Sequence, residues 1–485
     1  MAKYNCTICN QIIEVDNIDE IDTCPICGVS KEYLELTEEQ IEKPFPVIEG
    51  PIPISENNPG IARIEEKCIK CGLCSKICQE KVGMRYDPKK ATEPACLSCG
   101  QCILNCPVGA LVPKYCYKTV LNYINDTDKV VVAFTSPAVR VALGEVFNST
   151  DINVEGKMVA SLKELGFDYV LDTTFGADLT IMEEASELIS RIKENKALPQ
   201  FTSCCPAWVR YLEIYHPNLT KYLSTCKSPI GMQGAIIKSY FAEMMGIPSE
   251  NIISVAITPC TAKKSEIALP NNQDTDFVIT TSELALMIRE NKIDFNNLQD
   301  EPYDSIMGRG SGAGVIFGNS GGVMEAAVRT AYHFLTNKSP KNELLSFTKV
   351  RGYDNVKEAE VNIDNLNLKL LVVHGMTNIE PILKDLEKGK LDYHFIEVMN
   401  CPGGCVGGGG QPLGIISKQQ EINERRISGL YKEDADLKIK NSYENPDIID
   451  IYQSYLEKPL SRKSEKLLHT SYQDRSSILG DNSLI

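Results

Sequence analysis

From about residue 125 onward, short apolar runs alternate with longer amphipathic segments. The apolar runs predict buried strands at residues 129–134, 167–174, 254–260, 277–281, 368–375 and 393–399. The amphipathic segments predict helices at residues 139–147, 157–166, 178–195 and 282–292. This alternation indicates an α/β domain, in which helices flank parallel sheets and a crevice forms at the carboxyl ends of the strands.

The chain ahead of this domain divides at a stretch rich in proline. Residues 43–60 contain five prolines and two glycines, which is typical of a semi-extended linker. We therefore predict a small module at 1–42, the linker at 43–60, a second small domain at 61–118, the α/β domain at 119–472 and a disordered tail at 473–485.

The composition points to metal sites in a reducing compartment. The 485 residues include 19 cysteines, and their net charge is −15. No apolar run reaches the roughly eighteen residues of a membrane span, and the start, MAKYNCTICN, lacks the features of an export signal. We therefore expect a cytoplasmic protein with no membrane partner. Because such compartments do not keep disulfides, the cysteines indicate metal ligands.

Acidic charge gathers at the N-terminal end. Residues 1–60 hold twelve Asp and Glu against three Lys. This balance argues against a nucleic-acid partner, and it favours either a partner with a basic face or a surface that is merely solvated.

Two Cys-x2-Cys pairs lie in the N-terminal module. Cys6, Cys9, Cys24 and Cys27 predict one tetrahedral site of four thiolates. The second pair, in CPICG, resembles the rubredoxin-like module at the end of rubrerythrins, which implies one mononuclear iron. A zinc ribbon has the same ligands, so zinc stays open, and iron is favoured because the rest of the chain carries electron-transfer motifs.

Two longer cysteine runs follow the linker, each with the spacing Cys-x2-Cys-x2-Cys-x3-Cys. They begin at Cys68 and Cys96. The doubled pattern resembles the bacterial two-cluster ferredoxins, which implies an α+β fold and two 4Fe–4S clusters. By this resemblance, one cluster is held by Cys68, Cys71, Cys74 and Cys106, and the other by Cys96, Cys99, Cys102 and Cys78.

Three further segments with cysteines lie in the α/β domain. They read TSCCPAW (202–208), TPCTAKKSE (258–266) and EVMNCPGGCVGGGGQP (397–412). Together they resemble the signature motifs of the iron-only (FeFe) hydrogenases, and the resemblance spans roughly residues 125–472. It implies an H-cluster, in which a 4Fe–4S cube is bridged to a di-iron subcluster with carbon monoxide, cyanide and azadithiolate ligands. The implied ligands of the cube are Cys205, Cys260, Cys401 and Cys405, with Cys405 as the bridge.

The same resemblance implies a proton relay. Cys204 is expected to face the pocket as a shuttle, and the relay continues through Glu184, Ser224, Glu187 and Arg191. Spacing alone allows a blander interpretation, in which the charged residues form a surface ladder of ion pairs on one helix face and Cys204 is an inert buried thiol.

Other residues are expected around the H-cluster. Lys263 is expected to donate to one cyanide, and the loop of Ser136, Pro137 and Ala138 to the other. Met399 and Phe317 are expected to exclude water. Thr258 replaces the methionine that is usual in the family and adds a hydroxyl near the site, and Gln411 completes the predicted cofactor contacts.

The combined patterns predict an FeFe hydrogenase that interconverts dihydrogen with protons and electrons. Electrons are expected to pass through the two 4Fe–4S clusters and the rubredoxin-like site to a soluble carrier such as ferredoxin, flavodoxin or rubredoxin, and hydrogenase maturation proteins are further expected partners. A hydrogen sensor and a non-enzymatic Fe–S assembly protein are the alternatives. The intact Cys204 disfavours the first, and the complete third cysteine motif disfavours the second.

Overall fold

The computed structural model describes residues 2–6, 12–15, 21–23, 30–31, 34–36, 48–364 and 366–480. The chain forms two compact units, Met1–Val47 and Ile48–Ile485. In the first unit, β1 (Ala2–Cys6), β2 (Ile12–Val15) and β3 (Leu34–Leu36) form an antiparallel sheet in the order β2-β1-β3. Cys9, Cys24 and Cys27 lie outside the described residues, as does the side chain of Cys6, so the four-thiolate site stays a prediction.

The second unit begins with a small antiparallel pair of strands. β4 (Ile61–Arg63) pairs with β5 (Leu111–Pro113), and the cysteine runs lie between them with α1 (Leu73–Glu80) and α2 (Gln101–Leu104). Gly72 and Gly100 precede these helices at φ values of 76° and 71°, a left-handed conformation that glycine adopts without strain. The two cysteine runs therefore share one local geometry.

A parallel sheet in the order β10-β9-β6-β7 forms the first layer of the α/β region. Its strands are β6 (Val130–Thr135), β7 (Tyr169–Asp172), β9 (Ile252–Thr258) and β10 (Phe277–Thr280). Along β6, Val131 and Ala133 pack toward α3 (Tyr117–Ile124), α6 (Glu155–Glu164) and α12 (Thr281–Glu290). Val132 and Phe134 pack on the opposite face, toward α7 (Thr173–Glu194) and α9 (Pro229–Ile236).

A second sheet has the order β11-β12-β13-β8. The strands β12 (Leu366–His374), β13 (Phe395–Met399) and β8 (Gln200–Phe201) are parallel, and β11 (Val356–Ile363) adds an antiparallel edge. Alternate residues of β12 again face two helical layers. One layer holds α7 and α14 (Gly322–Thr336), and the other holds α8 (Pro206–Tyr215) and α16 (Met376–Glu387).

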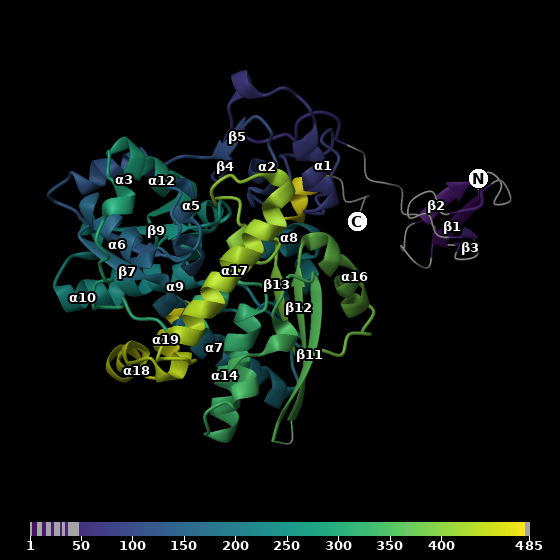
Figure 1. Cartoon of the computed structure of the whole chain (residues 1–485). Helices are drawn as coiled ribbons and strands as arrows, with labels where there is room; N and C mark the ends of the chain where they lie inside the picture. The colour runs from purple at the N-terminus through teal and green to yellow at the C-terminus, as the bar shows by residue number, and fades with distance from the viewer. Residues whose placement is uncertain are drawn as a thin grey trace. The chain divides into compact units, whose positions relative to one another are not determined.

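Helix α7 packs on both sheets and so connects the two layers (Figure 1). Phe175 and Leu179 contact the β6 side, whereas Ile181 and Leu188 contact the β12 side. The expected class, parallel sheets flanked by helices, is confirmed.

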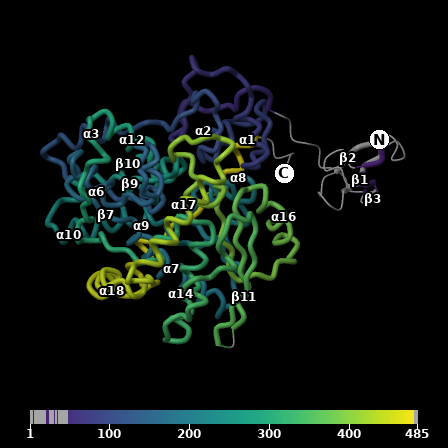
Figure 2. The backbone as a smooth tube through the Cα atoms, viewed as in Figure 1, coloured from purple at the N-terminus to yellow at the C-terminus, as the bar shows by residue number. Residues whose placement is uncertain are grey.

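Other helices complete this unit. They are α4 (Pro137–Arg140), α5 (Leu143–Val146), α10 (Ala242–Met245), α11 (Lys263–Glu266), α13 (Gly312–Val315), α15 (Asn342–Leu345), α17 (Gln419–Asp436), α18 (Pro446–Ile451) and α19 (Arg462–Leu468). The long α17 is prominent in the backbone trace of Figure 2 and packs on α13. None of the helices in the described part of the chain combines the length and the apolar character that a membrane crossing needs.

Several predicted elements differ from the structure. The strand expected at 167–174 ends at Asp172, because the Asp172 carboxylate accepts from the Thr174 amide at 3.0 Å and starts α7 there. The single helix expected at 139–147 is the two short helices α4 and α5. The edge strand β11 was not expected.

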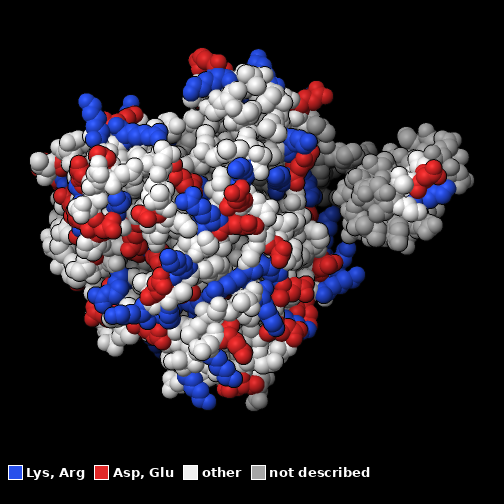
Figure 3. Space-filling view, in the orientation of Figure 1, with Lys and Arg blue, Asp and Glu red and all other residues white. Residues whose placement is uncertain are grey.

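The tail expected to be disordered is ordered over residues 473–480. Arg475 binds the Glu213 carboxylate of α8 at 2.7 Å, and Ile478 is buried. Residues 481–485 lie outside the described part. Within the stretch predicted as a linker, the Ile52 amide lies 3.3 Å from Cys74 Sγ, so this segment packs on the cysteine-rich domain. On the face of residues 48–480 seen in Figure 3, acidic and basic side chains are interspersed.

Candidate active site

Three cysteine-bearing loops follow the carboxyl ends of three parallel strands. Cys205 lies between β8 and α8, Cys260 between β9 and α11, and Cys401 directly beyond β13. Because β8 and β13 are paired neighbours in one sheet, their loops emerge at the same edge. The first sheet contributes the Cys260 loop.

Electrostatic coupling shows that these thiols lie together. Burial raises the pKa of Cys401 first, and the charges of Cys260, Cys205, Cys99 and Cys405 raise it further. Burial also raises the pKa of Cys260, to about 11, with Cys205 as the next contribution. Four buried thiolates here would repel one another, so their ionisation requires positive charge among them, which the irons of a 4Fe–4S cube supply.

The geometry is not that of a single-ion site. Among the described residues, no group of three or more His, Cys, Asp or Glu is arranged to hold one metal ion. A single ion requires ligand atoms at about 2.0–2.3 Å from one centre, whereas a cube carries its irons at separate corners.

Glycines allow the Cys405 loop to approach its neighbours closely. Gly404 has a φ of 97°, and a Cβ there would lie 2.5 Å from the Ser320 amide nitrogen. A Cβ on Gly408 would lie 2.3 Å from the Pro259 carbonyl oxygen, and the Gly410 amide donates to the same oxygen at 2.8 Å. Side chains at these positions would separate Cys405 from the Cys260 loop.

A hollow adjoins the thiols. Its lining includes most of the predicted cofactor contacts, namely Ser136, Pro137, Ala138, Cys204, Thr258, Cys260, Lys263, Phe317, Met399 and Cys405. Gln411 is outside this lining, but its amide donates to the Ala138 carbonyl at 2.9 Å and holds that loop. Phe317 and Met399 are almost fully buried, so the wall they form excludes water.

The adjacent cysteines Cys204 and Cys205 face different surroundings. Cys204 lines the hollow, whereas backbone hydrogen bonds from Asn400 and Trp208 reach Cys205. Burial raises the pKa of Cys204 well above the usual thiol range, and Glu184 is the next contribution. The Cys204 thiol is therefore protonated and lies near the Glu184 carboxyl.

Helix α7 carries Glu184, Glu187 and Arg191 of the predicted relay, and Ser224 meets Glu187 from the segment before α9. The Ser224 hydroxyl donates to Glu187 Oε2 at 2.8 Å, and Arg191 binds Glu187 Oε1 at 2.6 Å. Burial raises the pKa of Glu184 to about 8, the charge of Glu187 adds to this, and the nearby Ser224 hydroxyl opposes it. Glu184 Oε2 is buried and has no hydrogen-bond partner among the described residues. Glu184 and Glu187 are therefore buried and do not lie on an open surface.

Lys263 is held at the edge of the hollow. Its ammonium donates to the Cys204 carbonyl at 3.0 Å and to Glu266 at 2.9 Å. Burial alone would lower the pKa of Lys263, but Glu266 reverses this and raises it, so the side chain stays charged. A fixed cation beside the hollow suits an anionic ligand. The motif contains Glu266, but its role as the partner of Lys263 was not foreseen.

The second cysteine-rich run lies against this site. After burial, the charges of Cys96, Cys99, Cys102 and Cys74 raise the pKa of Cys78, so Cys78 lies near the thiols of the other run. The structure leaves the grouping of Cys68, Cys71, Cys74 and Cys106 a prediction.

Three hydrogen bonds join this run to the cysteine motifs of the α/β domain. Gln101 Nε2 lies 3.2 Å from Cys401 Sγ and donates to the Gly407 carbonyl at 2.9 Å. Thr261 Oγ1 donates to the Ser98 carbonyl at 2.6 Å. Sequence analysis missed Gln101, and its position next to Cys102 in the ferredoxin-like run was the available signal.

A buried four-thiol site, an apolar hollow and a second cysteine cluster beside it define an iron–sulfur protein. The family described as iron only hydrogenase large subunit, C-terminal domain, matches residues 129–409, and that described as iron hydrogenase small subunit matches residues 420–475. The chain belongs to the iron-only hydrogenase family.

Individual relatives support this family assignment. The NADP-reducing hydrogenase subunit HndD of Solidesulfovibrio fructosivorans is 41% identical over 96% of this chain and 84% of its own length. Iron hydrogenase 1 of Clostridium pasteurianum is 40% identical over 91% of this chain and 81% of its own. The structure of FeFe-hydrogenase HydA1 from Chlamydomonas reinhardtii matches with a TM-score of 0.65 and 38% identity, over 74% of this chain and 98% of that chain.

The predicted enzyme class is therefore confirmed. The chain is an iron hydrogenase, an oxidoreductase acting on dihydrogen and protons, and its family implies an H-cluster and iron–sulfur clusters. The alternative of an Fe–S assembly protein has weaker support, since the cytosolic Fe-S cluster assembly factor narfl of Danio rerio is 30% identical over 71% of this chain and 86% of its own length.

Proposed function

We propose that Cys205, Cys260, Cys401 and Cys405 hold the H-cluster and that Cys204 is the first proton carrier beside it. The observation that carries this proposal is the pair of adjacent cysteines, because Cys204 lines the hollow and couples to Glu184, while Cys205 couples to the other thiols. When bound, the cofactor supplies the reversible cleavage of dihydrogen into two protons and two electrons.

Protons move along side chains of this protein. The Cys204 thiol gives its proton to Glu184, whose pKa of about 8 lets it be protonated or ionised near neutral pH. Ser224 both donates and accepts, and it connects Glu184 with Glu187. Lys263 stays charged and orients the anionic part of the cofactor, while Phe317 and Met399 keep water out.

Electrons leave through the cysteine-rich domain. The coupling of Cys99 with Cys260 and Cys401 supports a route from the cube to a 4Fe–4S cluster held by Cys96, Cys99, Cys102 and Cys78. A second cluster on Cys68, Cys71, Cys74 and Cys106 continues the route toward a soluble carrier such as ferredoxin, flavodoxin or rubredoxin. The N-terminal Cys6, Cys9, Cys24 and Cys27 hold a mononuclear iron at its end.

The test uses infrared spectroscopy of protein matured with the di-iron precursor. We expect sharp carbon monoxide and cyanide bands that shift under hydrogen gas. Cys204→Ala is expected to keep the bands and lose turnover, whereas Cys205→Ala is expected to lose the bands. Bands that are absent from the wild type while the cubane clusters are fully present would overturn the proposal.

A further inference from the structure

The relay as described ends at Arg191, which is poorly suited to release a proton. A guanidinium has a pKa above 12 and offers donors but no acceptor. Besides Glu187, Arg191 donates to the carbonyls of Ala197, Tyr222 and Leu223 at 2.7–3.1 Å. Carbonyl oxygens do not carry a proton onward. The contacts of Arg191 therefore orient Glu187 and do not extend the chain of proton carriers.

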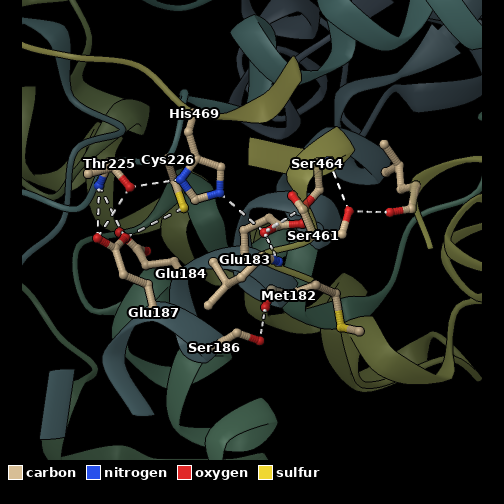
Figure 4. Close-up of polar contacts among 12 residues, drawn as sticks. Met182, Glu183, Glu184, Ser186, Glu187, Thr225, Cys226, Ser461, Ser464 and His469 are labelled. Carbon is tan, nitrogen blue, oxygen red and sulfur yellow. Dashed lines mark hydrogen bonds and ion pairs between the residues drawn. The ribbon is translucent and has the colours of Figure 1, made fainter. Parts of the chain in front are cut away.

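Glu187 has a second partner, on the side of Thr225. The Thr225 hydroxyl lies 3.3 Å from Glu187 Oε1, and the Thr225 amide donates to Oε2 at 3.1 Å. On its other side, Thr225 Oγ1 lies 2.7 Å from His469 Nδ1 (Figure 4). The carboxyl, the hydroxyl and the imidazole therefore form an unbroken chain. Thr225 is exposed, so this chain reaches solvent.

A buried carboxylate fixes the orientation of His469. Its Nε2 lies 3.2 Å from Glu183 Oε2 (Figure 4). Glu183 also accepts from the Tyr452 hydroxyl at 2.6 Å and from the Leu460 amide at 2.8 Å, so its carboxyl is held in place. With Glu183 as the acceptor of the Nε2 hydrogen, Nδ1 of the imidazole faces the Thr225 hydroxyl as an acceptor.

We propose that Thr225 and His469 are the proton exit of the relay, and that Arg191 only positions Glu187. The inference rests on the proposed relay as far as Glu187. Protonated Glu187 gives its proton to Thr225 Oγ1 while the proton of that hydroxyl moves to His469 Nδ1. Glu187 becomes a carboxylate, Thr225 keeps one hydroxyl proton and His469 becomes an imidazolium. The resulting imidazolium lies between the carboxylates of Glu183 and Glu187, which stabilise its charge until water takes the proton. The titratable groups that surround it are Glu183, Glu187, Cys226 and Tyr452.

The experiment measures dihydrogen turnover in the matured full chain at neutral pH. His469→Ala and Thr225→Val are expected to lower turnover about a hundredfold, the lower end of the range of a positioned proton-transfer group. Thr225→Ser keeps the hydroxyl and is expected to retain activity. His333→Ala is the matched control, because His333 Nδ1 faces the Lys338 carbonyl, outside the relay.

Two readouts separate proton transfer from a structural role. Added imidazole is expected to restore the His469→Ala variant but not Thr225→Val, and the solvent isotope effect on turnover is expected to rise in both. The infrared bands and the thermal midpoint should stay as in the wild type. Wild-type turnover in both variants would overturn the proposed exit. A loss of turnover in His469→Ala that imidazole does not restore, together with a lower thermal midpoint, would also overturn it. If Glu187→Gln keeps full turnover, the proposed relay as far as Glu187 is wrong. If Glu187→Gln loses turnover while the His469 and Thr225 variants do not, the relay stands and only the proposed exit is wrong.

Discussion

Gln101 and Cys401 are joined by a hydrogen bond of 3.2 Å from the Gln101 side-chain amide to the sulfur. The two residues belong to different cysteine motifs, one in the ferredoxin-like run and one in the hydrogenase motif. The contact therefore places a neutral donor on a proposed cluster ligand, at the point where the two motifs meet.

Removing the Gln101 donor should lower the reduction potential of the 4Fe–4S cube. A hydrogen bond to a thiolate sulfur stabilises the reduced, more negative state of a cluster. Gln101→Leu is expected to shift the potential of the cube negative by on the order of tens of millivolts. A potentiometric titration followed by electron paramagnetic resonance measures it. Gln420→Leu is the control, since the Gln420 amide donates to the exposed Glu424 carboxylate on α17. Equal potentials in Gln101→Leu and wild type would contradict the role of Gln101 as a donor to a cluster sulfur.

Cys204 should be needed for turnover and not for cofactor binding. Cys204→Ala is expected to reduce hydrogen evolution by about a hundredfold or more, because Glu184 then has no proton carrier at the hollow. Iron content and infrared bands should match the wild type. Cys116→Ala is the matched control, because the Cys116 thiol bonds to the Val278 carbonyl and is not among the residues that line the hollow. Full activity in Cys204→Ala would exclude this residue as a carrier.

Glu184 should make stability depend on pH. Burial raises its pKa from 4.5 to about 8, so between these values the folded state keeps a proton that the unfolded state has released. The free energy of unfolding therefore falls as the pH rises through this window. Glu184→Gln, which cannot ionise, should lose this part of the slope. Thermal midpoints between pH 6 and 9 measure it, and identical slopes in the two proteins would refute the shift.

Gly404 should be required for the packing of the Cys405 loop. Gly404→Ala combines a left-handed φ of 97° with a Cβ 2.5 Å from the Ser320 amide nitrogen. Left-handed strain alone costs about 1–3 kcal/mol, and the overlap adds to it. Gly389→Ala is the control, since Gly389 has a φ of 66° but no atom within 4 Å of its Cβ position. Urea midpoints and iron content should fall further in Gly404→Ala than in Gly389→Ala. Equal losses in the two variants would exclude a packing role for Gly404.

The sequence predicted the parts of the fold that have strong local patterns. Buried parallel strands such as β9 and β13 are continuous apolar runs, and their positions agree with the structure to within a few residues. Strand β11 was missed because it alternates between exposed and buried positions at a sheet edge and reads as a charged segment. The long helix α7 was predicted, but its start was placed too late because the cap at Asp172 was not recognised.

For the site, motif positions could be predicted and long-range partners could not. Three motifs gave every cysteine that lies at the hollow or beside it. Gln101 and His469 act through contacts with residues far away in the sequence. Glu266 instead binds Lys263, three residues away. A single sequence does not show which distant residue such a side chain contacts. The N-terminal cysteines stay a prediction.

The two family matches meet inside the relay. Residues 420–475, which match the small-subunit description, supply Tyr452 and His469 to Glu183, and the Tyr472 hydroxyl to the Ser224 carbonyl. Because one polypeptide carries both parts, their docking is intramolecular and its occupancy does not depend on protein concentration. Dilution therefore cannot detach the C-terminal segment, and every folded copy of the chain carries the residues of the proposed proton exit.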